Sequence, residues 1–215
     1  MKFKAVLFDL DGTLVNSLID IADSMNKVLQ NRNLPTHDYK TINSFIGSGI
    51  LNLVNKALPE AYKNEENIQS CFEEMMNLYR ENCINKTYAY DGIVALLDQL
   101  RSRNIKLAIL SNKADELTKR IGLSLFPDYF EIVMGLKNES TKKPNPLGAI
   151  EISTDLGIVP EEILYVGDSG IDMQTAKNAN MYAVGVTWGY RPKEELLAEG
   201  AQSIIHHPLE LIELL

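Results

Sequence analysis

The sequence is poor in cysteine and lacks the marks of an exported or membrane protein. Cys71 and Cys83 are the only cysteines among 215 residues, too few for a disulfide framework, so we expect reduced thiols. No run of about 18 apolar residues occurs that could cross a membrane. The N-terminus has neither the long apolar stretch nor the cleavage site of a signal peptide. We therefore expect a soluble, cytoplasmic protein without a membrane partner.

Basic residues are also scarce. The chain has 21 Lys and Arg against 29 Asp and Glu, a net charge of −8. Binding to the nucleic-acid backbone requires clustered positive charge, so this balance argues against a nucleic-acid partner. It leaves room for a small anionic ligand, because such a ligand responds to local charge. The phosphate-binding loop of P-loop nucleotide hydrolases is absent, which excludes that class.

Short apolar runs alternate with helical patterns along most of the chain. Each run is too short for a buried helix and is typical of a strand covered on both faces. The expected strands are residues 5–8, 107–110, 132–134, 163–166 and 183–186. Helical patterns occupy about 93–103, 114–121, 146–157, 171–179 and 193–199. This alternation predicts an α/β fold, a doubly wound parallel sheet with helices on both faces.

Residues 17–85 break this alternation and contain only helical patterns. Apolar residues recur at helical spacing from Leu18 onward, and again through 50–57 and 68–82. We expect an inserted all-helical domain at 16–87, with the α/β domain formed by 1–15 and 88–215. Residues 60–81 carry six Glu against Lys63 and Arg80, which predicts a solvated acidic face.

Two acidic residues stand directly after the first expected strand. Asp9 and Asp11 precede Gly12 and Thr13. Carboxylates at the end of a buried strand are costly unless their charge is compensated, and hard cations such as Mg²⁺ prefer oxygen ligands. Gly12 permits a tight turn that brings Asp11 beside Asp9. The pattern indicates a Mg²⁺ site, with solvated acids in an ordinary turn as the alternative.

Polar residues also follow two later strands. Ser111 and Asn112 come after the second expected strand, and they offer a hydroxyl and an amide to phosphate oxygens. Asp168 follows the fourth, with Asp172 four residues beyond, and Lys143 stands between these two segments. Ligand sites of open parallel sheets form at the carboxyl ends of the strands. We therefore expect these side chains to meet in one crevice.

Taken in order, these segments resemble the four motifs of the haloacid-dehalogenase (HAD) superfamily of phosphatases. The matching segments are 9–13, residue 111, 143–144 and 167–172. The resemblance extends over essentially the whole chain, including an all-helical cap between the first two motifs. It implies a Rossmann-like core, Mg²⁺ as cofactor and a small phosphorylated metabolite as substrate.

The resemblance also implies roles for the motif residues. Asp9 would be the nucleophile that forms an aspartyl-phosphate, and Asp11 would act as general acid and base. An acid at Asp11 argues against dehalogenation. Ser111 and Lys143 would neutralise the phosphoryl oxygens. Mg²⁺ would be held by the carboxylates of Asp9 and Asp168 and the backbone carbonyl of Asp11.

Further residues have supporting roles in this resemblance. For Asp172 the resemblance favours orienting Lys143 or a metal-bound water over direct coordination of the ion, and both roles stay open here. Gly12, Thr13 and Asn112 would bind the substrate beside the catalytic groups.

A narrower resemblance is to phosphoglycolate phosphatases. Gly47, Ser48 and Gly49 lie in a segment that looks like the cap loop that reaches the substrate in that group. The segments 111–113 and 186–190 are also similar to its sequences. Either Arg191 or the amides of this cap loop would bind the carboxylate of such a substrate.

Other interpretations remain open at this stage. Asn16 and Asp91 depart from the family pattern at the two cap hinges, which concerns cap opening rather than chemistry. Related members act on pyrophosphate, nucleotides or sugar phosphates, so a pyrophosphatase, a nucleotidase or a phosphosugar mutase is the alternative. A non-catalytic binding protein on this fold is a third possibility. We expect a monomer or homodimer. Trp188, the only tryptophan, is expected to pack a loop rather than to stack on the substrate.

Overall fold

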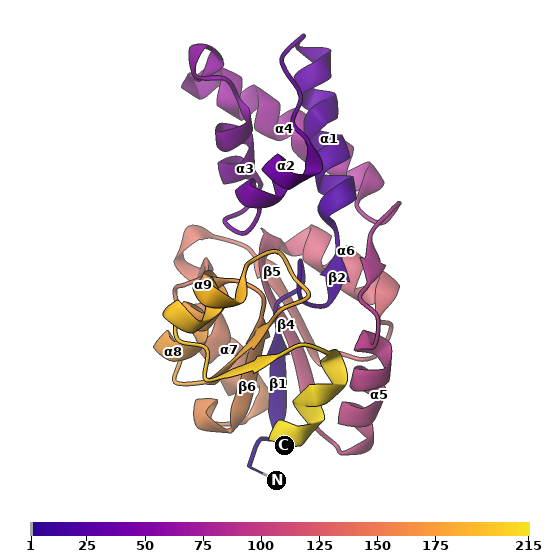
Figure 1. Ribbon diagram of the computed structural model, residues 1–215, viewed down its shortest axis with the longest axis vertical. Helices are drawn as coiled ribbons and strands as arrows, with labels where there is room; N and C mark the ends of the chain where they lie inside the picture. Colours follow the sequence, from indigo (N-terminus) through magenta and orange to yellow (C-terminus); the bar gives the residue numbers. More distant parts are fainter. Residues whose placement is uncertain (1) are drawn as a thin grey trace. The chain divides into compact units, whose positions relative to one another are not determined.

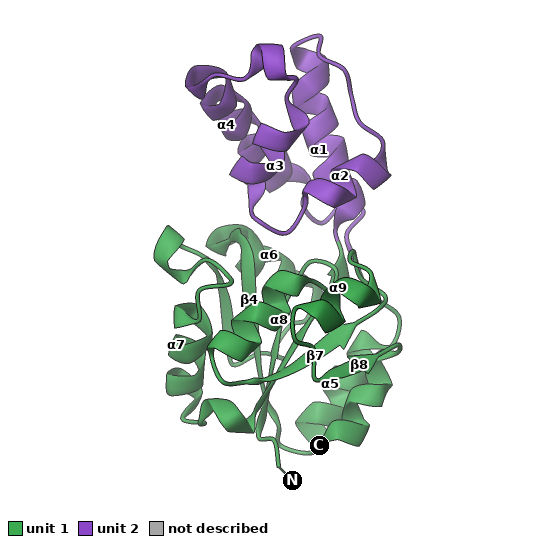
Figure 2. Ribbon diagram, turned by 60° about the vertical axis from the view of Figure 1, so that its left-hand side comes forward, with its two compact units in different colours: residues 1–16, 89–215 green, residues 17–88 purple. Residues whose placement is uncertain are grey.

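The computed structural model describes residues 2–215 and divides into two compact units. The first unit contains the described residues up to Asn16 together with Ala89–Leu215, and the second contains Ser17–Tyr88 (Figure 2). The short strands β2 (Val15–Asn16) and β3 (Tyr88–Ala89) pair where the chain passes between the units. Across residues 2–215, every helix is too short or too polar to cross a membrane.

The first unit is built on a six-stranded parallel sheet (Figure 1). Its strands are β1 (Ala5–Phe8), β4 (Lys106–Ala114), β5 (Ile132–Leu136), β6 (Ile163–Gly167), β7 (Tyr182–Val186) and β8 (Ser203–Ile205). The strand order is β5-β4-β1-β6-β7-β8, so β1 lies between β4 and β6. Ala5 is in register with both Lys106 and Ile163. The expected doubly wound α/β fold is confirmed, with β8 as an additional edge strand.

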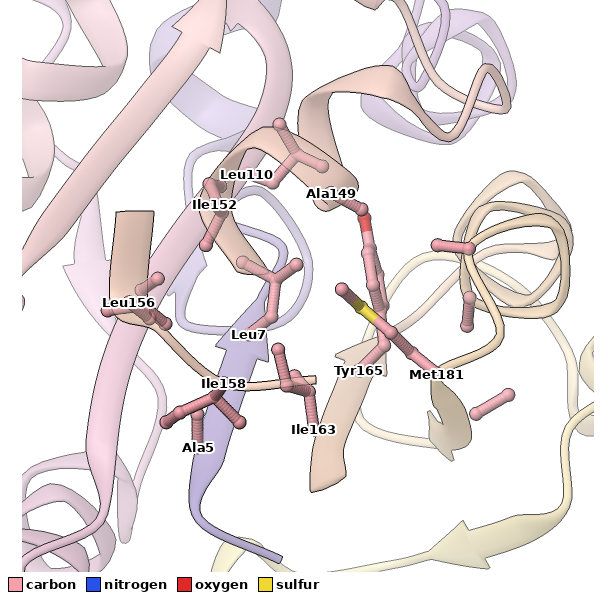
Figure 3. Close-up of a cluster of buried hydrophobic side chains, with 14 of the residues drawn as sticks. Ala5, Leu7, Leu110, Ala149, Ile152, Leu156, Ile158, Ile163, Tyr165 and Met181 are labelled. Carbon is pink, nitrogen blue, oxygen red and sulfur yellow. The ribbon is translucent and has the colours of Figure 1, made fainter. Parts of the chain in front are cut away.

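Helices cover both faces of this sheet. They are α5 (Ile93–Ser102), α6 (Asp115–Leu125), α7 (Leu147–Leu156), α8 (Gly170–Asn178) and α9 (Lys193–Ala198). Side chains of α7, α8 and α9 share one buried cluster with alternate strand residues such as Leu7, Leu110 and Tyr165 (Figure 3). On the opposite face, α6 approaches so closely that a Cβ on Gly122 would lie 3.3 Å from Ile109 Cδ1. Because successive strand residues point to opposite faces, continuous apolar runs were needed for this arrangement.

The second unit is helical, as its sequence patterns predict. Its helices are α1 (Leu18–Asn31), α2 (Tyr39–Phe45), α3 (Ile50–Ala57) and α4 (Glu65–Asn82). Asp20, in the first turn of α1, is buried and accepts hydrogen bonds from the backbone of Lys86 and from both the backbone and hydroxyl of Thr87. This carboxylate joins the start of α1 to the segment that follows α4. On the acidic face, Glu74 is not simply solvated, because it forms an ion pair with Arg32.

Candidate active site

The candidate site residues of the first unit lie at the carboxyl ends of its central strands. Asp9 directly follows β1, and Asp168 directly follows β6. Ser111 lies near the end of β4, which runs four residues further than its apolar core and loses regular register after Leu110. Lys143 comes from the segment before α7. Neighbouring parallel strands therefore bring these groups to one edge of the sheet, as predicted.

Lys143 is a buried lysine with three acceptors. Its ammonium lies 2.8 Å from Asp9 Oδ1 and 2.7 Å from Asp172 Oδ1, and it donates to the carbonyl of Leu110 at 3.2 Å. An ammonium has three protons, so this geometry satisfies all of them. Burial by itself would lower the pKa of Lys143, but the negative charges of Asp172 and Asp9 raise it well above its usual range. Lys143 therefore carries a fixed positive charge beside Asp9.

Asp172, in the first turn of α8, is fully buried, with 0% exposure. Its Oδ1 accepts from Lys143 and, at 3.5 Å, from the hydroxyl of Tyr165, and its Oδ2 accepts from the backbone and the hydroxyl of Ser169. A carboxylate has about four lone-pair positions, and protein donors fill all of them here. The geometry suits a residue that orients Lys143, as the sequence resemblance implied.

Asp168 is held by a different set of donors. The hydroxyl of Thr13 donates to its Oδ1 at 3.3 Å, and the backbone N–H of Tyr190 donates to its Oδ2 at 2.7 Å. Gly12, with φ +86°, passes so close that a Cβ would lie 2.2 Å from Asp168 Oδ2. Glycine is therefore needed at this position for its backbone angle and for the space that it leaves to Asp168.

Asp11 forms an ion pair that the sequence did not indicate. Its Oδ1 lies 2.8 Å from the ammonium of Lys113, whose side chain is only 3% exposed. The tight turn at Gly12 brings Asp11 near enough to Asp9 for its charge to help raise the pKa of Asp9, and the side chain of Asp11 also binds this lysine of β4. A signal for Lys113 did exist: it stands two residues after Ser111, and residues two apart on a strand share a face.

Ser111 and Asn112 complete this edge of the sheet. The backbone N–H of Lys113 donates to Ser111 Oγ at 3.2 Å. The amide of Asn112 accepts from the backbone N–H of Lys143 at 2.8 Å and donates to its carbonyl at 3.2 Å. Asn112 thereby fixes the backbone that carries Lys143. Binding of substrate by Gly12, Thr13 and Asn112 stays a prediction.

The predicted loop residues Gly47, Ser48 and Gly49 belong to the second unit. They connect α2 to α3, and both glycines have positive φ, +121° and +87°. A loop with two such glycines has a shape that other residues rarely adopt. Its role in binding substrate also stays a prediction.

The buried carboxylates leave the first unit with uncompensated negative charge. Ligand oxygens of Asp9, Asp168 and Asp172 all lie within 4.8 Å of one another. Burial and the nearby charge of Asp172 raise the pKa of Asp9 to about 7, although Lys143 counteracts them. Burial, Asp172 and Asp9 raise the pKa of Asp168 well above its usual range. When all three carboxyl groups are ionised, their charge exceeds that of the Lys143 ammonium by two, which is the charge that one divalent cation would balance.

A doubly wound sheet with a lysine and several carboxylates at the ends of its central strands defines an α/β enzyme core suited to charged groups such as phosphate. The chain belongs to the haloacid dehalogenase-like hydrolase family, whose model matches residues 6–186. The family resemblance seen in the four motifs is thereby confirmed.

Named relatives are similar over nearly the whole chain. A phosphoglycolate phosphatase of Aquifex aeolicus is 32% identical over 213 residues, covering 99% of this chain and 96% of the relative. One of Neisseria gonorrhoeae is 37% identical over 194 residues, 87% of this chain and 81% of the relative. The crystal structure of a predicted phosphoglycolate phosphatase of Haemophilus somnus superposes with a TM-score of 0.92 at 29% identity, covering 100% and 98% of the two chains.

Proposed function

We propose that this protein is a Mg²⁺-dependent phosphatase that hydrolyses a small phosphomonoester, phosphoglycolate, through an aspartyl-phosphate formed on Asp9. The observation that carries the reaction type is the contact between the buried Lys143 ammonium and Asp9, 2.8 Å apart at the end of β1. It places a permanent positive charge beside the oxygen that would attack phosphorus. The substrate is proposed from the relatives named phosphoglycolate phosphatase.

The proposed reaction has two steps. A carboxylate oxygen of Asp9 attacks the phosphoryl group while Asp11 protonates the departing alkoxide, and Asp11 then takes a proton from the water that hydrolyses the acyl phosphate. Lys143 and Ser111 stabilise the negative charge on the transferring oxygens. Splitting hydrolysis in this way replaces one difficult displacement by two easier ones.

A divalent cation fits the residues of this site. Asp9 and Asp168 keep lone pairs that protein donors do not fill, whereas Asp172 has none left. We assign the carboxylates of Asp9 and Asp168 and the backbone carbonyl of Asp11 as ligands, all of them the hard oxygen donors that Mg²⁺ prefers. When bound, Mg²⁺ supplies Lewis-acid stabilisation of phosphoryl charge.

The second unit is proposed as the cap that selects the substrate. Either the backbone N–H groups of its loop at Gly47, Ser48 and Gly49 or the guanidinium of Arg191 would bind the carboxylate of the two-carbon acid. A short acid phosphate offers little apolar surface, so charge and hydrogen bonds must supply its recognition. We further propose a cytoplasmic location and a monomer or homodimer.

The test is a screen of phosphorylated metabolites with Mg²⁺, measured as release of inorganic phosphate with and without a chelator. We expect phosphoglycolate to have the highest kcat/KM, and the chelator to abolish turnover until excess Mg²⁺ is added. Pyrophosphate, nucleoside monophosphates and sugar phosphates serve as comparison substrates. A clear preference for one of these would contradict phosphoglycolate as the substrate and would leave the proposed phosphatase activity standing. Turnover of none of them, or turnover unaffected by the chelator, would contradict the reaction as proposed.

Replacing Lys113 with Met should impair the step that needs Asp11. Without the ammonium, the Asp11 carboxyl loses the partner that fixes it. We expect kcat/KM for an alkyl phosphate to fall by about 100-fold, the lower range for general acid–base catalysis. The loss on p-nitrophenyl phosphate should be much smaller, because its leaving group needs no proton.

Lys106→Met is the matched control for this comparison. Lys106 begins the same strand, where its ammonium binds, among residues 2–215, only the carbonyl of Leu156. Equal losses on both substrates in Lys113→Met would argue that this lysine serves structure alone.

A further inference from the structure

The segment 187–190 follows β7 directly and contacts residues of the candidate site. It connects β7 to α9, and no reaction step has been assigned to it. The indole Nε1–H of Trp188 donates to the carbonyl of Thr13 at 2.9 Å, across 175 positions of sequence. The backbone N–H of Tyr190 donates to Asp168 Oδ2 at 2.7 Å. Two residues of one loop therefore bind the two segments that hold the buried carboxylates.

Gly189 lies between these two hydrogen bonds and is packed against the same groups. A Cβ at this position would lie 2.3 Å from Asp168 Cβ and 2.4 Å from the carbonyl oxygen of Gly12. Both distances are far below a van der Waals contact, so a side chain could enter only if the loop moved. The backbone of this segment thus rests directly on the side chain of Asp168.

The segment is also fixed at its start. The backbone N–H of Thr187 donates to the carbonyl of Ile205 at 3.2 Å, and its hydroxyl lies 2.9 Å from His206 Nδ1. A loop held at this end by the edge strand β8 and at the other by Thr13 and Asp168 has little freedom to move. Donors that hold a ligating carboxylate from outside set its orientation.

We propose that the segment 187–190 is a positioning element for Asp168. In this role, the indole of Trp188 anchors the loop on Thr13 so that the Tyr190 N–H and the Thr13 hydroxyl fix one oxygen of Asp168 each. Asp168 is thereby held in the orientation that receives a divalent cation. The inference rests on the proposed function only in taking Asp168 as a ligand of Mg²⁺. It also makes the single tryptophan a reporter of this site.

The test measures Mg²⁺ affinity without substrate, as the Mg²⁺ concentration that gives half of the rise in melting temperature. Each variant is compared with its own metal-free melting temperature. Trp188→Phe keeps a smaller aromatic ring and removes the donor, and we expect it to need about 10-fold more Mg²⁺, as for other outer partners of metal ligands. Tyr182→Phe is the matched control, since it removes one hydrogen bond, to Ser203, from the same strand–loop unit. Its midpoint should stay within about twofold of the wild-type value.

A second measurement uses the intact protein and does not depend on how a variant folds. The emission of Trp188 in wild-type protein is titrated with Mg²⁺, and we expect a saturable change with the same midpoint as the melting experiment. A wild-type midpoint in Trp188→Phe, or an emission that Mg²⁺ leaves unchanged, would overturn the inference.

Failure of the proposed function gives a different result. A wild-type protein that binds Mg²⁺ but hydrolyses no phosphomonoester contradicts the phosphatase, and the two Mg²⁺ measurements still decide on segment 187–190. Hydrolysis by the wild type with unchanged Mg²⁺ affinity in Trp188→Phe contradicts the positioning role alone.

Discussion

Replacing Asp9 with Asn should reduce phosphate release by at least about 10⁴-fold, the scale on which loss of a nucleophile acts in covalent catalysis. An amide oxygen is neutral and cannot form the acyl phosphate, whereas it can still accept the hydrogen bond from Lys143. The measurement is the rate of phosphate release at saturating Mg²⁺. Asp98→Asn is the control, because Asp98 is an exposed acid of the same unit that accepts a hydrogen bond from the hydroxyl of Tyr129.

The same variant should not lose stability. Because burial and Asp172 raise the pKa of Asp9 from 3.8 to about 7, ionisation of this carboxyl opposes folding as pH rises between these values. At pH 8 and without metal, the melting temperature of Asp9→Asn should therefore equal or exceed that of the wild type. Substantial turnover by a folded Asp9→Asn protein would contradict the proposed role of Asp9 as the nucleophile. A large fall in its melting temperature would contradict the conclusion that ionisation of Asp9 beside Asp172 opposes folding.

Replacing Lys143 with Met should damage both activity and folding. The variant buries Asp9, Asp168 and Asp172 together with no positive charge among them. Removing one partner of a buried ion pair costs about 3–5 kcal/mol, and we expect a loss of this size in the free energy of unfolding without metal. Phosphate release should fall below detection, since the charge beside Asp9 is lost.

Two further variants make this expectation specific. Lys142→Met removes the neighbouring lysine, which pairs only with Glu139 among the ion pairs of residues 2–215, and should change stability by less than about 0.5 kcal/mol. Adding Asp172→Asn to Lys143→Met should restore part of the lost stability without restoring turnover. An unfolding free energy in Lys143→Met equal to that of the wild type would show that the buried charges are compensated in another way.

The central strands were predictable because both of their faces are buried. A strand such as β1 or β6 then reads as an unbroken apolar run, and its end is marked by the polar residue that follows. The edge strand β8 was missed because it is short and only Ile205 in it is buried. Helix α2 was missed for a similar reason, since Ile42 is its one buried residue and gives no periodic pattern.

Which residues of the candidate site could be predicted has a similar physical basis. Asp9, Ser111, Lys143 and Asp168 could be found because each stands at a strand end or before a helix in a fixed order. Lys113 could not be predicted in the same way, because a lysine by itself indicates a solvent-exposed position. Its burial depends on the ion pair with Asp11, 102 positions earlier in the sequence.

Contacts made by the backbone were still harder to find. The Tyr190 N–H on Asp168 belongs to a group that every residue except proline carries, so no residue type announces it. The sequence shows such a close backbone contact only indirectly, as a glycine at a position like Gly189 where no side chain fits.

The position of β1 in the sheet has a consequence for synthesis of the chain. The ribosome makes this strand long before its neighbours β4 and β6, which begin only at Lys106 and Ile163. Both edges of β1 consequently lack their partners while the second unit, which is continuous in sequence, is being completed. Asp9 is thus translated well before the groups that enclose it. A chain released before Asp168 carries Asp9 without the rest of the site, so an incomplete product cannot assemble this cluster of carboxylates.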